Sequence, residues 1–238
     1  MLARPPAAVG GGCRSKLVAV LAIAALCVSS DIAAAAVTPA QVVSSALAKA
    51  RAQSSVHYVS GQVSGGTSVT INGDAARDRG IQRITYRKGG RVGHLTVLVV
   101  ANTAYVRGDA FILTSYMRIP LSESSAWAGK WLSLAHSAPD FAADAAAVRL
   151  VSTLAELTMP PPFHSVGTST RQGHRVVGIA SHFQRSGHEI TETLYIDLAR
   201  SLPVQLVGRS GTTTITGTFS RWNEPVSVSA PTSAIAIR

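Results

Sequence analysis

The chain has 238 residues, of which 46% are hydrophobic and 14% are charged, and its 22 Lys and Arg against 12 Asp and Glu give a net charge of +10. That apolar content supports a folded core and excludes wholesale disorder. The 2 cysteines exclude a disulfide-stapled scaffold and a cysteine-rich zinc or iron–sulfur site, and no apolar run fits a multi-span membrane protein.

The first 36 residues predict a secretory signal peptide. Basic residues come first, an uncharged stretch covers residues 17–30, and alanines occupy residues 33–36. The uncharged stretch is shorter than the ~20 residues that span a bilayer, which favours a cleaved export signal over a retained anchor. We therefore expect a single domain at residues 37–238, located in the periplasm or cell envelope or secreted.

Cys27 raises the alternative of lipid anchoring, because bacterial lipoproteins are acylated on a cysteine at the end of such a stretch. Leu26 stands directly before Cys27, where a small residue is expected. The sequence therefore favours a free exported protein over a lipid-anchored one. Its excess of arginine over lysine and its many alanines are typical of a GC-rich, for example actinobacterial, genome.

An amphipathic helix is expected at residues 38–53, with Thr38 as its cap and Gln41 completing a capping box. Strands with a period of two follow, separated by the turn-type pairs Gly65-Gly66, Asn72-Gly73, Gly89-Gly90 and Gly108-Asp109. The expected strands are 56–59, 68–71, 81–87, 94–100 and 104–107. Because tight turns join antiparallel neighbours, we predict a meander.

The middle of the chain is predicted to return to helix. One helix is expected over residues 121–134, and a second starts after Pro139, continues to Ala155 and stops before the prolines at 160–162. Strands then resume at 164–170, 174–184, 189–198, 204–209, 212–219 and 226–229. Because neither run of strands looks self-sufficient without the central helices, we predict one α+β domain.

No catalytic or metal-binding motif stands out. The sequence lacks a nucleophile elbow, a zinc-protease motif, a phosphate loop and a dinucleotide fingerprint. His174 and His182 would lie about 26 Å apart on one strand, too far for one ion, and His182 with His188 has no third ligand. Glu189 and Glu192 face opposite sides of a strand. We expect no enzyme activity, no cofactor and no metal, with an unrecognised hydrolase triad as an alternative.

Basic residues cluster between Arg77 and Arg91. Nucleic-acid binding is possible on charge alone, but export and the lack of interleaved aromatics argue against it. A lipid head group or a membrane surface is the better partner, with Arg83, Arg87 and Arg91 as its contacts. The plainer alternative is a solvated hairpin face.

Several segments, taken together, resemble one known family. They are residues 103–109, 130–132, 192–197 with 202–204, and 219–226 with 230–231. In this order they resemble the LppX/LprG-type mycobacterial lipoproteins. The resemblance implies the fold shared with the LolA lipoprotein carriers: a strongly curved antiparallel half-barrel, with helices covering its concave face and acyl chains lying between the two.

From this resemblance we expect an exported, monomeric, non-enzymatic carrier or binding protein for lipid or lipoprotein acyl chains. Burying an acyl chain is worth about 0.8 kcal/mol per CH₂. The residues expected to line the cavity are Trp131, Phe141, Val148, Val151, Leu154, Val97, Val99 and Tyr105, and the alanine-rich residues 142–147 would leave space in it. The alternative is an envelope sensor or protein-interaction module on the same fold, which binds a regulatory partner.

Overall fold

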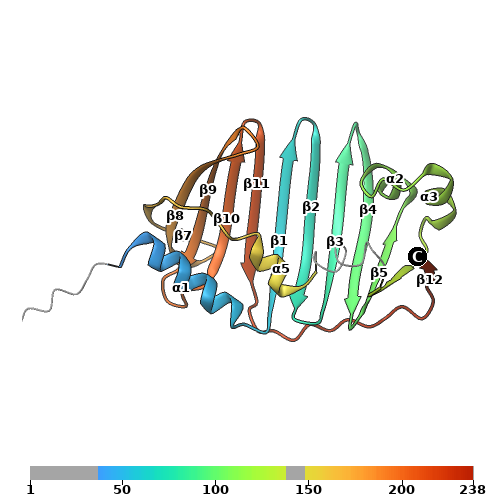
Figure 1. Ribbon diagram of the computed structural model, residues 1–238, viewed down its shortest axis with the longest axis horizontal. Helices are drawn as coiled ribbons and strands as arrows, with labels where there is room; N and C mark the ends of the chain where they lie inside the picture. Colours follow the sequence, from blue (N-terminus) through green and yellow to red (C-terminus); the bar gives the residue numbers. More distant parts are fainter. Residues whose placement is uncertain (1–36, 138–147, 238) are drawn as a thin grey trace, which may run out of the picture. The chain divides into compact units, whose positions relative to one another are not determined.

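The computed structural model describes residues 37–137 and 148–237, which belong to one compact unit, Val37–Arg238. A 12-stranded sheet forms its centre (Figure 1). The strands are β1 (Ser55–Ser64), β2 (Thr67–Ala76), β3 (Arg79–Lys88), β4 (Arg91–Val100), β5 (Thr103–Gly108), β6 (Leu132–Ala135), β7 (Phe163–Arg171), β8 (His174–Arg185), β9 (His188–Asp197), β10 (Pro203–Ser210), β11 (Thr213–Ser220) and β12 (Ile235–Ile237). The helices of the described residues are α1 (Pro39–Arg51), α2 (Ala110–Ser115), α3 (Leu121–Trp127) and α5 (Leu150–Ala155).

The sheet consists of two antiparallel meanders that meet in its middle. Strands β1 to β6 pair in chain order, strands β7 to β11 do the same, and β1 pairs with β11 to join the two runs. The last strand, β12, pairs in parallel with β6 at one edge, and β7 forms the other edge. The sheet is therefore open, and the predicted α+β half-barrel is confirmed.

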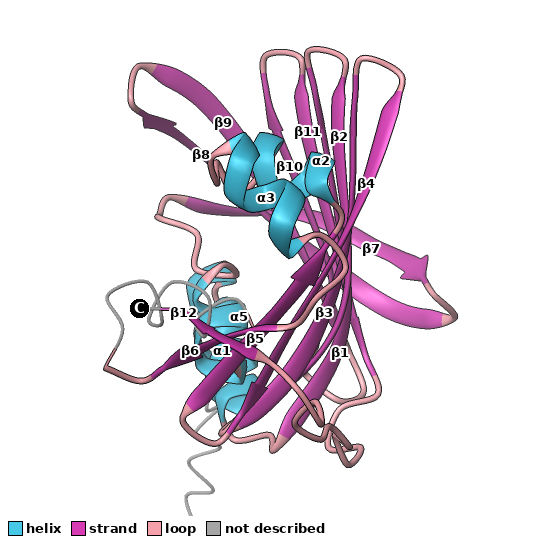
Figure 2. Cartoon of the chain, turned by 90° about the vertical axis from the view of Figure 1, so that its right-hand side faces the viewer, coloured by secondary structure: helices cyan, strands magenta, loops and turns pink. Residues whose placement is uncertain are grey.

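All four described helices lie on one face of the sheet, which we call the inner face (Figure 2). Helices α1 and α5 contact each other, with α1 also contacting β7, β9 and β10 and α5 contacting β2, whereas α2 contacts β4 and α3. Two apolar clusters result. One lies under α1 and α5 and includes Leu47 and Leu154. The other lies under α2 and includes Ile112 and Val97.

Helix α1 forms where the sequence predicts it. The Thr38 backbone N–H donates to Gln41 Oε1 over 2.8 Å, and the Gln41 N–H donates to Thr38 Oγ1 over 3.3 Å, which completes the capping box. The buried residues Val43, Ala46, Leu47 and Ala50 repeat at helical spacing on the side that packs on the sheet.

The predicted helix at residues 121–134 is wrong in its second half. Helix α3 ends at Trp127, and Gly129 has a φ of +75°, a left-handed conformation that stops a helix. Residues Leu132–Ala135 instead form β6, which pairs with β5. The edge of β5 offers backbone hydrogen bonds over these residues, and a longer helix would leave that edge without this partner.

Helix α2 was not predicted. Asp109 caps it by accepting a hydrogen bond from the Ile112 N–H at 3.0 Å. Two strand glycines let the helix approach closely, because a Cβ at Gly93 or at Gly108 would lie 2.8 Å from Ile112 side-chain atoms. Short helices of this kind are fixed by such packing more than by their own sequence.

The predicted turn at Asn72-Gly73 is also wrong, because both residues lie inside β2. The Tyr58 ring of β1 crosses Gly73, where a Cβ would lie 2.4 Å from the ring, and its hydroxyl accepts a hydrogen bond from Gln82 on β3. Glycine is needed at this position for close approach and not for turning. At the C-terminus, residues 226–229 form no strand, and Ile235–Ile237 forms the closing one.

Candidate functional site

The strand register places inner-face residues in transverse rows across the sheet. One row contains Leu194, Leu206, Gly217, Ser60, Ile71, Ile84 and Leu95. The next row, two residues further along the strands, contains Glu192, Gly208, Ile215, Gln62, Val69, Tyr86 and Gly93. Because side chains alternate along a strand, these two rows face the side on which the helices lie.

The middle of these rows is less covered than either end. Ile215 is 38% exposed although it faces inward, and its neighbours Gln62, Val69, Ile71 and Ser60 are exposed or half-buried. Ile71 packs against both apolar clusters. We call Ser60, Gln62, Val69, Ile71 and Ile215 the open patch. Its apolar side chains are Val69, Ile71 and Ile215, and it lies between the helix pair α1 and α5 and the helix α2.

Four of the predicted cavity residues are packed into the inner side of the molecule. Val97 and Val99 are 4% and 0% exposed on β4, and Val148 and Leu154 are 0% and 2% exposed. Val148 lies directly over the sheet, because a Cβ at Gly80 would come 2.1 Å from its carbonyl oxygen. These four side chains are part of the buried core, whereas residues of the open patch, such as Ile215, are exposed.

The other predicted cavity residues are not brought to the same place. Val151 is 74% exposed on α5. Tyr105 pairs with Leu98, which alternates with the inward-facing Val97 and Val99 and therefore faces outward. Tyr105 thus also lies on the outer face of the sheet. Trp131 lies against the outward-facing Arg107, with the guanidinium carbon 5.9 Å from its ring. Phe141 and the alanine-rich residues 142–147 lie outside the described residues.

The three predicted head-group arginines are divided between the two faces. Arg83 and Arg87 alternate with the buried Ile84 and Tyr86 of β3, so they point outward. Arg91 instead shares the parity of Leu95 and Val97, and its guanidinium carbon lies 4.2 Å from the centre of the Phe111 ring. The three residues therefore do not form one contact surface.

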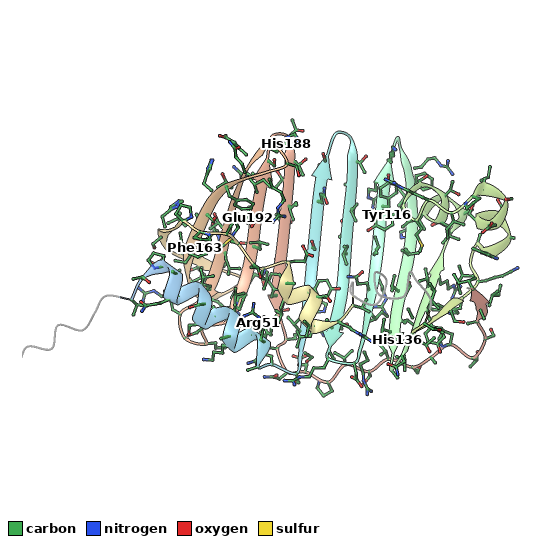
Figure 3. All side chains as sticks on the ribbon, viewed as in Figure 1. Arg51, Tyr116, His136, Phe163, His188 and Glu192 are labelled. Carbon is green, nitrogen blue, oxygen red and sulfur yellow. The ribbon has the colours of Figure 1, made fainter. Side chains whose placement is uncertain are left out.

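Glu192 of β9 lies in the same row as Ile215 (Figure 3). The ring centre of Tyr116, which follows α2, lies 5.5 Å from that of Tyr86, the register partner of Val69. Burial raises the pKa of the Glu192 carboxyl, Arg185 acts against this rise, and Glu156 adds to it. Burial also raises the pKa of Tyr116. Deeper in the inner face, burial raises the pKa of Tyr58 to about 12. At these three groups burial disfavours the charged form.

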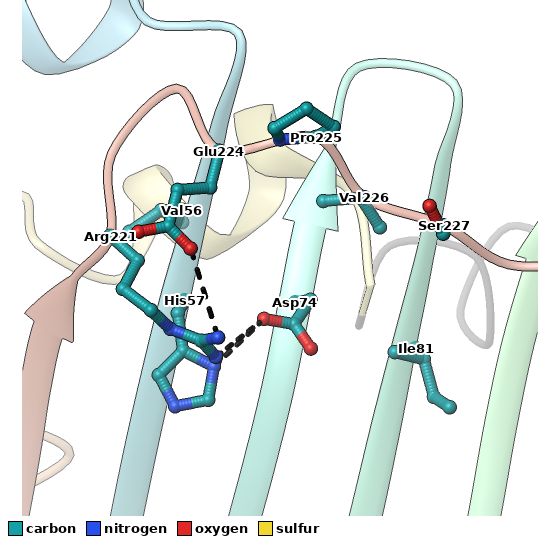
Figure 4. A pocket seen from close by; sticks show the side chains of 9 residues that line it. All are labelled: Val56, His57, Asp74, Ile81, Arg221, Glu224, Pro225, Val226 and Ser227. Atoms are coloured by element: carbon teal, nitrogen blue, oxygen red, sulfur yellow. Dashed lines mark hydrogen bonds and ion pairs between the residues drawn. The ribbon is translucent and has the colours of Figure 1, made fainter.

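A small pocket of about 100 Å³ lies on the outer face, beneath the chain segment that follows β11 (Figure 4). In it His57 Nδ1 lies 2.8 Å from Asp74 Oδ1, and Arg221 contacts Asp74 at 3.2 Å and Glu224 at 3.8 Å. Ser227 lies on the far side of Asp74 from His57, so these residues do not form a Ser-His-Asp arrangement. The contact between Arg221 and Asp74 holds the segment that follows β11 against the sheet.

Two absences apply to residues 37–137 and 148–237. None of the helices in these residues has the length and apolarity needed to cross a membrane. The same residues contain no group of three or more His, Cys, Asp or Glu placed to hold a metal ion.

The open patch was not predicted from the sequence, although a signal for it exists. In the segment 213–219 the inward positions are Thr213, Ile215, Gly217 and Phe219, which pass from polar to apolar along one strand. Gly217 and Ser60 have the smallest side chains in their row, between Leu206 on one side and Ile71 on the other. Side chains alternate between the two faces along each strand. Once the β1–β11 pairing is known, this alternation identifies which residues of both strands face inward.

No protein-family model and no curated protein matches the chain. Among solved structures, LprF from Mycobacterium bovis is similar with a TM-score of 0.58 at 14% identity, covering 81% of this chain and 96% of that one. The lipoprotein LppX from Mycobacterium tuberculosis is similar with a TM-score of 0.51 at 14% identity, covering 80% and 98%. At this identity the likeness concerns the fold, so the chain has the open half-barrel fold that LprF and LppX share.

Proposed function

We propose that the protein is an exported, non-enzymatic carrier or binding protein for the acyl chains of lipids or acylated lipoproteins in the bacterial cell envelope. The observation that supports this most is the open patch. It is an inward-facing apolar surface, flanked by two packed clusters, whose Ile215 is 38% exposed. The fold shared with the lipoprotein LppX agrees with this proposal.

The energetics favour a lipid as the occupant of the open patch. Covering apolar surface is worth about 25 cal/mol per Å², and an acyl chain gains about 0.8 kcal/mol for each CH₂ it removes from water. Gln62 and Ser60 border the apolar side chains and provide few polar groups to satisfy. A carrier also needs no reactive residue. The buried Val97, Val99, Val148 and Leu154 would then belong to the packed clusters on either side of the surface, and Val151 would border it.

The test compares two aspartate substitutions on neighbouring strands. Ile215→Asp places a carboxylate in the open patch, and Val63→Asp places one on the outer face of β1, where Val63 is 57% exposed. The protein is produced by an exporting bacterial host, incubated with mixed phosphatidylcholine and phosphatidylglycerol vesicles, reisolated and analysed by native mass spectrometry. We expect lipid adducts on the wild type and on Val63→Asp, and at least ~10-fold less on Ile215→Asp, because an acyl chain would desolvate the new charge.

Two results would overturn the proposal. A wild-type chain without adducts before and after incubation with vesicles has no accessible lipid site. Equal adducts on both variants would show that lipid binds away from the open patch. If a partner protein co-purified at a stoichiometric ratio with protein that carries no lipid, the alternative of an envelope sensor or protein-interaction module would be favoured.

A further inference from the structure

The β3–β4 hairpin ends in two cations that face inward. Lys88 and Arg91 are direct partners in the register, and both have the parity of the inward Tyr86 and Gly93. We call these two residues the basic corner. Both side chains are exposed. Like charges placed directly opposite each other on a sheet are destabilising, so the basic corner is a cost to the fold on its own.

No carboxylate offsets this cost. Neither Lys88 nor Arg91 takes part in an ion pair with any residue in the described part of the chain. Arg91 is held against an aromatic ring instead, with its guanidinium carbon 4.2 Å from the Phe111 centroid. At the other side of the inner face Arg185 has a different environment, because it lies close enough to Glu192 to lower that carboxyl's pKa.

The basic corner is continuous with the open patch. Lys88 pairs with Thr67, and Thr67 pairs with Ser64, whose hydroxyl accepts a hydrogen bond from Thr213 at 2.8 Å. Hydroxyls and cations thus border the end of the open patch. From the Ile71 level to the Thr67 level the inner face extends four residues, or about 13 Å. This matches the roughly 15 Å that an acyl chain covers in half of a bilayer core.

We infer that the basic corner binds the anionic head group of an amphiphile whose acyl chains lie on the open patch. This inference rests on the proposed function and adds the ligand's charge and orientation. A phosphate or carboxylate between Lys88 and Arg91 removes the like-charge repulsion and accepts charge-assisted hydrogen bonds from both side chains. The hydroxyls of Thr67 and Ser64 suit the polar part next to the charge. The ligand class is therefore an anionic lipid, bound with its head at the β3–β4 hairpin.

The experiment uses two soluble probes with identical acyl chains, dioctanoyl phosphatidylglycerol and the uncharged dioctanoylglycerol, below their micelle-forming concentrations. The double variant Lys88→Gln/Arg91→Gln is compared with Arg83→Gln/Arg87→Gln, which removes the same charge from the outer face of the same hairpin. With about 1 kcal/mol for each cation, we expect the basic-corner variant to bind dioctanoyl phosphatidylglycerol about ten- to thirtyfold more weakly. The affinity of the basic-corner variant for dioctanoylglycerol should stay within about twofold of the wild-type value. The same holds for the affinities of the Arg83→Gln/Arg87→Gln variant for both probes.

The outcomes separate this inference from the proposed function. If the wild type binds neither probe, the proposed function fails and this inference with it. If it binds both probes equally, or if the outer variant loses as much affinity as the basic-corner variant, lipid binding stands and the basic corner is not a head-group site. A basic-corner variant that keeps its affinity for the soluble probe but no longer floats with phosphatidylglycerol vesicles would assign the two cations to the membrane surface, which also overturns the inference.

Discussion

The inner face of the sheet has a covered part and an open part, built from the same strands. In the covered part, under α1 and α5, Tyr58, Ala75 and Phe219 are 7% exposed or less, and the polar Gln82 donates a hydrogen bond to Tyr58. In the open patch, a few residues along the same strands, Ile215 is 38% exposed. Covered apolar residues hold the domain together, whereas uncovered ones of similar chemistry remain available for a ligand. The following predictions separate these two roles.

The largest effect is expected in the covered part. Leu154→Ala should lower the free energy of unfolding by about 2–5 kcal/mol, because it leaves a cavity under α5. Val151→Ala is the matched control on the same helix. Since Val151 is 74% exposed, its truncation should change the free energy by less than about 0.5 kcal/mol. Urea denaturation followed by circular dichroism measures both. If Val151→Ala lowered the free energy of unfolding as much as Leu154→Ala does, burial would not separate residues that stabilise the fold from residues that do not.

A smaller effect is expected where a strand glycine meets a covered side chain. Gly73→Ala pushes a methyl group into the Tyr58 ring, and overpacking of this kind costs about 1–3 kcal/mol. Gly208→Ala places the same methyl group beside the open patch, where the nearest side-chain atom is 3.5 Å away. We expect Gly208→Ala to be neutral or slightly stabilising. Thermal unfolding of the two variants tests this, and an equal loss from both would show that strand glycines are costly to replace regardless of cover.

The smallest effect concerns Glu192, which is half-buried in the same row as Ile215. Its pKa is raised mainly by burial, so the folded state favours the protonated form. Stability from this group is fully present below the unfolded-state pKa and is lost as the pH rises through the folded-state pKa. Glu192→Gln should therefore unfold less readily than the wild type at neutral pH, by up to about 0.5 kcal/mol, and equally at low pH.

The control for this prediction is Glu189→Gln. Glu189 is exposed on the outer face of the same strand, where it lies 4.0 Å from His182. Denaturant midpoints across a pH series distinguish the two carboxylates. An equal gain from Glu189→Gln would point to net charge and not to the burial of Glu192.

Much of the fold could be predicted from local sequence, because its signals are local. The capping box at Thr38 and Gln41 predicts α1, and the glycine pairs at 65–66 and 89–90 do occupy the turns where they were expected. Gly73 was misread because its role depends on Tyr58, a residue of another strand. Trp131 was misplaced because Gly129 ends the helix before it.

The candidate site was harder to predict than the fold. Arg83, Arg87 and Arg91 are close in sequence, but the period of two and the intervening turn place Arg91 on the opposite face from the others. The open patch depends on the pairing of β1 with β11, which no local pattern specifies. Tyr105 shows the same limit, since its face follows from its register with Leu98.

The pairing of β1 with β11 has a consequence for the order of folding. His57 pairs with Ser220, so the contact that joins the two meanders spans 220 − 57 = 163 residues. Such distant pairings are slow to form, because a long loop must close before any contact rewards it. Until the chain is complete through β11, β1 and β10 remain edges with unpaired backbone groups, which are prone to wrong association. Synthesis must therefore be nearly finished before the centre of this sheet can close.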